Sequence, residues 1–205
     1  MKFGGFQPLT LSDYPGITAA IAFTQGCNFR CPFCHNGALI PPMAAESCLL
    51  PESEILNHLR KRRGKLEGLV VTGGEPTIQP ALPGFLRRVK SLGYKIKLDT
   101  NGSRPEVLAA LLEQGLLDYI AMDLKAPLEK YALLGGVSVS MRALEESIAL
   151  LAWSGVTHEF RTTVVPNLLT PQDLKQIESL VPAGSFWRRQ AFRPEHALDP
   201  ALRTA

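Results

Sequence analysis

The chain has 205 residues, of which 45% are hydrophobic, and its formal charge is only +3. This length can bury a full core and fits one domain, 1–205, while the small charge gives no reason to expect nucleic acid as a partner. No apolar stretch approaches the roughly 20 residues of a membrane span, and the start, MKFGGFQPL, lacks the apolar core of a signal peptide. We therefore expect a cytoplasmic protein whose thiols are reduced.

Strand and helix signals alternate along the chain. Short apolar runs predict six strands, at 17–23, 66–71, 94–98, 119–122, 158–165 and 186–192. Helical periodicity and Pro or Gly boundaries predict five helices, after Pro51, at about 80–92, from Pro105, near 140–153 and after Thr170. This alternation predicts an α/β fold with a parallel sheet and crossover helices, without a break between domains.

A distinctive polar motif follows each predicted strand. In chain order these are the cysteine loop 24–37, TGGEP (72–76), DTNG (99–102), DLK (123–125), VPN (165–167) and FRPEH (192–196). The carboxyl ends of parallel strands meet at one edge of a sheet, and ligands bind there. Any one of these loops could be only a turn. Six of them at one edge favour a large shared ligand.

Three cysteines lie close together in the first of these loops, GCNFRCPFCHN (26–36), with His35 directly after the last. Two metal sites are open: a structural Cys₃His zinc site, or a [4Fe–4S] cluster whose fourth iron has no protein ligand. The C-x₃-C-x₂-C spacing on one continuous loop favours the cluster, because structural zinc sites more often use two separated pairs. Zinc would indicate an interaction module, and an open iron indicates an enzyme.

At this point the sequence resembles the radical S-adenosylmethionine (SAM) enzymes, whose C-x₃-C-x-aromatic-C signature is present as Cys27, Cys31, Phe33 and Cys34. Together with TGGEP, DTNG and DLK, the cysteine motif resembles the activases of glycyl radical enzymes. LSDYPG (11–16) and QAFRPEHALDP (190–200) are similar to the activating proteins of anaerobic ribonucleoside-triphosphate reductase. The resemblance covers nearly the whole chain.

This resemblance implies an incomplete parallel barrel of (β/α)₆ type, with an open side wide enough for a protein loop. It implies a [4Fe–4S] cluster and SAM as cofactors, and reductive cleavage of SAM to a radical that abstracts a glycine hydrogen atom from the partner enzyme. A flavodoxin or ferredoxin-type protein is the electron donor that it implies. The alternative within the same family is an enzyme acting on a small heterocycle, such as a purine-like compound.

The resemblance also assigns roles to residues. The metal ligands are Cys27, Cys31 and Cys34. The expected cofactor-binding residues are Phe33, Cys34, His35, Asn36, Gly73, Gly74, Glu75, Asp99, Asp123, Leu124, Lys125 and His196.

Among the assigned residues, Gly73 and Gly74 are expected to leave room for the methionine amino group, and Glu75 to accept a hydrogen bond from it. Asp99, Asp123 and Lys125 are expected to hold the ribose, the carboxylate or a small monovalent cation, and the resemblance does not choose among these. Asp123 and Lys125 could instead form only a surface ion pair.

The sequence also predicts the surroundings of one cysteine, one arginine and two tryptophans. Cys48 is the only cysteine outside the motif, and its apolar neighbours predict a buried structural thiol. Arg161 is predicted to point from a strand into the barrel, where its charge needs a partner; substrate contact is the alternative. Trp153 and Trp187 are predicted to serve packing.

Overall fold

The computed structural model describes residues 1–41 and 48–203; the predicted domain also includes 42–47 and 204–205, which lie outside this description. Its strands are β1 (Lys2–Thr10), β2 (Ala19–Thr24), β3 (Leu50–Pro51), β4 (Gly68–Gly73), β5 (Lys95–Thr100), β6 (Tyr119–Asp123), β7 (Thr157–Val164) and β8 (Phe186–Ala191). Its helices are α1 (Glu52–Lys61), α2 (Leu82–Ser91), α3 (Pro105–Glu113), α4 (Tyr131–Gly135), α5 (Met141–Trp153) and α6 (Pro171–Leu180). None of the helices in these two described ranges is long and apolar enough to span a membrane.

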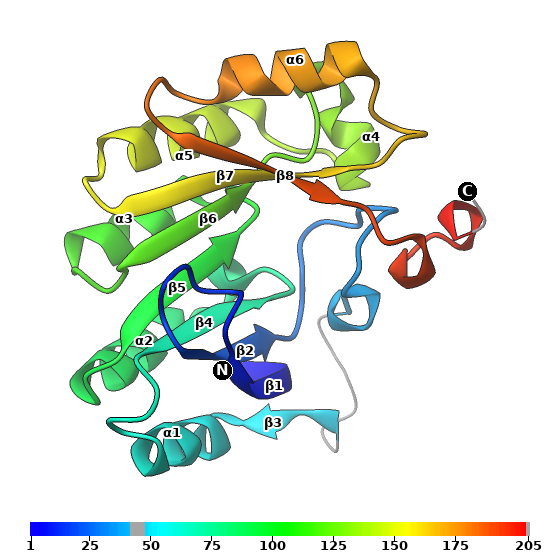
Figure 1. The fold of residues 1–205 in the computed structure, drawn as a ribbon. Coiled ribbons are helices and arrows are strands. Elements are labelled where there is room, and N and C mark those ends of the chain that lie inside the picture. The colour runs from blue at the N-terminus through cyan, green and yellow to red at the C-terminus, as the bar shows by residue number, and fades with distance from the viewer. Residues whose placement is uncertain (42–47, 204–205) are drawn as a thin grey trace.

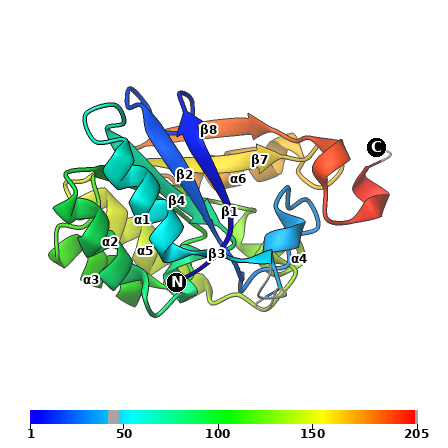
Figure 2. The same cartoon turned by 90° about the horizontal axis from the view of Figure 1, so that it is seen from below.

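One sheet organises the described chain, with its strands in the order β3-β1-β2-β4-β5-β6-β7-β8. From β2 to β8 every neighbouring pair is parallel. Helices α1, α2, α3 and α5 gather on one face of this sheet in Figure 2, and Figure 1 shows α6 beside β7 and β8. The predicted α/β fold with a six-stranded parallel body is confirmed. The strand order ends at β3 and β8, which do not pair with each other, so the sheet is open.

The two faces of the sheet carry different side chains, because successive residues of a strand point to opposite sides. Under the helices the strands contribute fully buried apolar residues, such as Leu69, Ile96 and Ile120. On the inner face, β5 and β7 contribute Lys97 and Arg161 instead. The helix-covered face therefore holds the core, and the inner face provides a polar floor for a site.

Two strands were not predicted, and both run antiparallel. β1 pairs with β2 on one side and with β3 on the other. The sequence of β1, KFGGFQPLT, contains two glycines and a proline, which weaken any strand signal, and its register with β2 shifts twice. β3 has two residues, too few for a periodic pattern.

The tryptophan predictions have different outcomes. Trp187 is half-buried, and its Nε1 donates a hydrogen bond to Thr162 Oγ1 at 3.0 Å. Trp153 is 90% exposed, so its predicted packing is wrong. Its helix buries Ile148 and Leu151, and a residue two positions after Leu151 lies on the opposite face of a helix.

Candidate functional site

A cavity of about 460 Å³ lies at the carboxyl ends of the parallel strands. The cysteine loop, the TGGEP and DTNG loops, β6, β7 and β8 all contribute to its lining. The sequence-predicted site residues that line it are Cys27, Cys31, Phe33, Cys34, His35, Asn36, Gly73, Gly74, Glu75, Asp99, Asp123 and Lys125. Five of the six motifs predicted to meet at one edge of the sheet contribute to this lining, and VPN (165–167) does not.

The cysteine loop directly follows β2 and is folded by its own backbone. The N–H of Cys34 donates to the carbonyl oxygen of Cys31 at 3.0 Å, and the N–H of Phe29 lies 3.4 Å from the Cys27 sulfur. The Arg30 N–H donates to the carbonyl oxygen of Gly135, which ties the loop to α4. Burial raises the pKa of the Cys27 thiol to about 12 and that of the Cys31 thiol to about 11. Such thiols need a positive group, such as a metal, to become thiolates.

His35 does not complete a four-ligand site with the cysteines. Its Nε2 accepts a hydrogen bond from the backbone N–H of Arg193 at 3.2 Å, and its ring stacks on Phe192 with centroids 5.6 Å apart. Burial lowers the pKa of its imidazole, which favours the neutral ring. In the described ranges, no group of three or more His, Cys, Asp or Glu side chains is arranged to hold one metal ion.

Cys48, the remaining cysteine, is exposed and does not line the cavity. The prediction that it is buried is therefore wrong. The apolar Leu49 and Leu50 beside it are only half-buried, because this segment leads into the short edge strand β3 rather than into the core. The donor set facing the cavity is three thiols, which fits a cluster that needs one thiolate on each of three irons.

The two glycines of TGGEP pack against the start of the cysteine loop. A Cβ on Gly74 would lie 2.0 Å from the carbonyl oxygen of Gly26, and one on Gly73 would lie 2.5 Å from the backbone nitrogen of Thr24. Gly73 also has a φ of 112°, which favours glycine. These contacts give a reason for both glycines that does not involve a ligand. A side chain at position 74 would collide with Gly26, and the predicted room for the methionine amino group stays a prediction.

Glu75 is fully buried, and the surrounding backbone and hydroxyl groups satisfy its carboxylate. Oε1 accepts from Thr77 N at 3.0 Å, Thr77 Oγ1 at 2.6 Å and Thr100 Oγ1 at 2.8 Å, and Oε2 accepts from Asn101 N at 2.7 Å. Burial raises the pKa of the carboxyl group, and these hydrogen bonds oppose that shift. Glu75 therefore fastens the TGGEP loop to the DTNG loop. Its assignment to the SAM ammonium stays a prediction.

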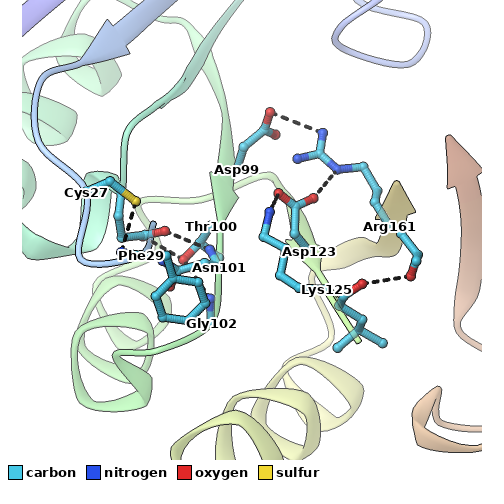
Figure 3. Close-up of polar contacts among 12 residues, drawn as sticks. Cys27, Phe29, Asp99, Thr100, Asn101, Gly102, Asp123, Lys125 and Arg161 are labelled. Atoms are coloured by element: carbon cyan, nitrogen blue, oxygen red, sulfur yellow. Dashed lines mark hydrogen bonds and ion pairs between the residues drawn. The ribbon is translucent and has the colours of Figure 1, made fainter. Parts of the chain in front are cut away.

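A chain of alternating charges crosses the inner face of the sheet, and Figure 3 shows its part from Asp99 through Arg161 and Asp123 to Lys125. Lys97 Nζ lies 2.5 Å from Asp99, Arg161 contacts Asp99 at 3.2 Å and Asp123 at 2.9 Å, and Lys125 contacts Asp123 at 2.9 Å. The neighbouring cations hold the pKa values of both aspartates below their ordinary range despite burial. Arg161 has the partners that its predicted position requires, and the Asp123–Lys125 pair lies in the cavity rather than on the surface.

Two predicted cofactor residues do not line the cavity. Leu124 is fully buried in the core, and its backbone N–H donates to the carbonyl oxygen of Arg161 at 2.8 Å. The side chain of His196 is 56% exposed and lies in the short turn Pro194–His196, where its ring contacts that of His35 at 6.2 Å between centroids. His196 is thus outside the cavity lining, and its contact with SAM stays a prediction.

Several cavity residues were missed. They are Gln7, Asp13, Thr100, Asn101, Thr163, Gln190 and Arg193. Thr100 and Asn101 belong to DTNG, so the motif carried a signal for them. Gln7 comes from β1, where no strand was predicted, and Asp13 lies in the LSDYPG motif after it.

Comparisons with known proteins agree with this geometry. Residues 21–181 match the Radical SAM superfamily. "Putative glycyl-radical enzyme activating enzyme MJ1227" of Methanocaldococcus jannaschii is 33% identical over 95% of this chain and 81% of its own length. "Probable GTP 3',8-cyclase" of Thermococcus kodakarensis is 32% identical over 67% of this chain and 46% of its own length.

The fold also has a solved counterpart. The crystal structure of Streptococcus suis SuiB bound to precursor peptide SuiA superposes with a TM-score of 0.64, at 15% identity, over 84% of this chain and 38% of that chain. At this identity the likeness concerns the fold alone. With the superfamily match over most of the chain and a relative 33% identical across nearly all of it, the chain belongs to the radical SAM superfamily of enzymes.

Proposed function

We propose that this protein activates a glycyl radical enzyme by abstracting a glycine hydrogen atom, as a single radical SAM domain spanning 1–205. The observation that carries the proposal is the meeting of three cysteines and the TGGEP, DTNG and DLK loops at one cavity. The M. jannaschii relative, whose name describes this activity, aligns with 95% of the chain. The thiol donor set fits a [4Fe–4S] cluster.

In this proposal Cys27, Cys31 and Cys34 hold three irons of the cluster, and SAM occupies the rest of the cavity. When bound, the reduced cluster and SAM supply the radical that takes the hydrogen atom; the protein supplies position and electrostatics. The inner-face cations Lys125 and Arg161 attract the carboxylate of the cofactor. The neutral His35 ring, held against Phe192, offers an apolar face to its adenine.

The open side of the sheet supports a protein substrate. Gln7 and Asp13, near one end of the strand order, and Gln190 and Arg193, at or just beyond the other, all line the same cavity. A loop of the partner that enters between β1 and β8 therefore reaches the cavity without crossing the core. From LSDYPG and QAFRPEHALDP we propose anaerobic ribonucleoside-triphosphate reductase as that partner. We further propose a flavodoxin or ferredoxin as electron donor, and the cytoplasm as the location.

A second candidate is a radical SAM enzyme that acts on a purine-like small molecule. The observation in its favour is the similarity to the T. kodakarensis protein named as a GTP 3',8-cyclase. That similarity spans less than half of the T. kodakarensis protein, whereas the M. jannaschii relative is covered over 81% of its length. The activase is therefore the better supported function.

The test is an anaerobic assay with purified candidate partners. Protein with a reconstituted cluster, a chemical reductant and SAM is incubated with anaerobic ribonucleotide reductase, and the sample is examined by electron paramagnetic resonance for a glycyl radical. A reductase in which the radical-bearing glycine is replaced by alanine is the matched control. A glycyl signal only with the intact partner supports the proposal. SAM cleavage stimulated by GTP but by no glycyl radical enzyme would support the second candidate.

A further inference from the structure

Each oxygen of the Asp99 and Asp123 carboxylates already has a cationic partner. Asp99 Oδ1 accepts from Lys97 and Asp99 Oδ2 from Arg161. Asp123 Oδ1 accepts from Arg161 and Asp123 Oδ2 from Lys125. Among the described side chains Arg161 alone forms ion pairs with both carboxylates, and Figure 3 shows its guanidinium between them. An alkali cation held by these two aspartates would have to compete for oxygens that are engaged.

The strand register fixes this bridge. Asp123 on β6 is the direct partner of Arg161 on β7, and Asp99 on β5 pairs with Ala121, two residues before Asp123 on the same face. The three side chains therefore project from adjacent strands toward the same face. The Arg161 side chain is only 13% exposed, and its backbone oxygen accepts from Leu124 N. Rigid strands thus hold the guanidinium in place, rather than a mobile loop.

The charge balance leaves no deficit for a further cation. Three cations, Lys97, Lys125 and Arg161, face the two carboxylates, and the Asp13 side chain, which lines the same cavity, brings the charges of these described residues to neutrality. The nearby Glu159 and Arg188 lie 3.0 Å apart and leave this balance unchanged. A monovalent cation would add an uncompensated positive charge beside Lys97, Lys125 and Arg161, where like charges repel. Lys125 and Arg161, which line the cavity, instead suit an anionic group of a ligand.

We infer that the Arg161 guanidinium is a built-in cation that takes the place of the monovalent cation expected between Asp99 and Asp123. Arg161 is then a positioning residue. It keeps both carboxylates ionised and oriented, and its side chain lines the cavity. The inference rests on the proposed function only because its tests use SAM as the ligand. Whether an alkali cation binds between the two aspartates is a property of the protein without SAM.

The first experiment uses the cluster-loaded protein in KCl, NaCl or choline chloride at about 0.15 M, where general screening is the same. SAM affinity is measured by isothermal titration, and the thermal unfolding midpoint is measured without SAM. We expect SAM dissociation constants that agree within about twofold in all three salts, and matching midpoints. A saturable increase in affinity or midpoint with K⁺ or Na⁺ overturns the inference.

The second experiment removes the guanidinium. In Arg161→Gln we expect SAM affinity in choline chloride to fall about tenfold or more, and K⁺ to restore part of it, because two carboxylate oxygens have lost their partners. Arg161→Lys keeps a positive charge and should remain insensitive to K⁺. Arg142→Gln makes the same change in an exposed helical ion pair with Glu146 and should match wild type in every salt.

The outcomes separate this inference from the proposed function. If SAM does not bind in any salt, the proposed function fails, and the unfolding midpoints of wild type still decide the cation question. If Arg161→Gln binds SAM like wild type in choline chloride, Arg161 is not the required cation and the inference fails. If Arg161→Gln does not fold, the salt series on wild type and Arg161→Lys gives the decision.

Discussion

The backbone N–H of Asn101 donates a 2.7 Å hydrogen bond to Glu75 Oε2, so the loops after β4 and β5 share one buried carboxylate. The same asparagine reaches the cysteine loop, since its side-chain nitrogen donates to Asn28 Oδ1 at 2.9 Å. Asn28 in turn donates to Ser103 Oγ at 2.8 Å. Three sequence motifs that look independent are therefore parts of one hydrogen-bonded frame around the cavity.

Glu75→Gln should destabilise the protein, although glutamine has nearly the same shape. Its amide nitrogen would face a backbone N–H or hydroxyl donors, leaving buried groups without acceptors, at a cost of about 1–3 kcal/mol each. Denaturant unfolding monitored by circular dichroism measures the change. Glu106→Gln, which removes an exposed carboxylate 3.6 Å from Arg104, is the control and should change stability by less than about 1 kcal/mol. Equal stability of Glu75→Gln and wild type would contradict the role of Glu75 as a fastener.

Gly74→Ala tests whether this glycine serves the frame or the ligand. The new methyl group would lie 2.0 Å from the carbonyl oxygen of Gly26, so the cysteine loop must shift. We expect a loss of about 1–3 kcal/mol in unfolding free energy, as for overpacking, together with reduced iron loading. Gly84→Ala is the matched control, since its methyl group meets nothing closer than 3.6 Å and lies in α2. That variant should gain up to about 1 kcal/mol from helix propensity.

If Gly74→Ala kept wild-type stability and iron content but lost SAM affinity, the result would indicate that Gly74 leaves room for the ligand rather than for Gly26.

Asp173 gives a prediction for pH. It accepts a hydrogen bond from Lys130 at 2.7 Å and others from Thr170 at the start of α6, and these contacts lower the pKa of its carboxyl group from 3.8 to about 2. A carboxylate whose pKa is lower in the folded state stabilises that state above pH 4 or so, and this contribution is lost as the pH falls toward about 2. Asp173→Asn should therefore be less stable than wild type at pH 7, and the difference should narrow below pH 4.

Urea unfolding of both proteins at several pH values measures this difference. Glu106→Gln serves again as the control, because its exposed carboxylate should give little difference at any pH. A difference in unfolding free energy between Asp173→Asn and wild type that stays constant from pH 7 to pH 3 would contradict a stabilising role of the ionised Asp173 carboxylate.

The parallel body of the fold could be predicted because each of its strands is a self-contained signal. An apolar run such as that of β4 is bounded by polar or glycine-containing turns and followed by a helix with its own periodicity. β1 could not be predicted, because Gly4, Gly5 and Pro8 remove the local pattern and only pairing with β2 makes it a strand. α4 has five residues, too few to show a helical period.

Which residues line the cavity was easier to predict than the contacts that hold them there. The topology of a parallel sheet brings the loops after its strands to one edge, so the motifs meet without knowledge of any side-chain contact. The contacts of Gly74 with Gly26 and of Glu75 with Asn101 join residues far apart in the sequence, and no local pattern specifies them. For Arg161, burial of a charge predicted that a partner must exist, but not that it would be two aspartates.

The four cysteines give the most direct test of the proposed site. Cys27, Cys31 and Cys34 face the cavity and should each be needed, so replacing any one by alanine should reduce iron content and the visible absorption of the cluster and abolish SAM cleavage. Cys48 is exposed and lies outside the cavity lining, which makes Cys48→Ser the matched control for loss of a thiol.

We expect Cys48→Ser to keep iron content, spectrum and production of 5′-deoxyadenosine at wild-type levels, with little effect on stability, because an exposed side chain contributes little packing. Wild type prepared without oxygen should be brown and should bleach in air. Colourless wild type that contains zinc, and loses it in Cys48→Ser, would instead indicate a four-cysteine structural site. Full SAM cleavage by Cys31→Ala would show that the radical chemistry does not depend on this loop, because two thiolates cannot hold three irons of a cluster.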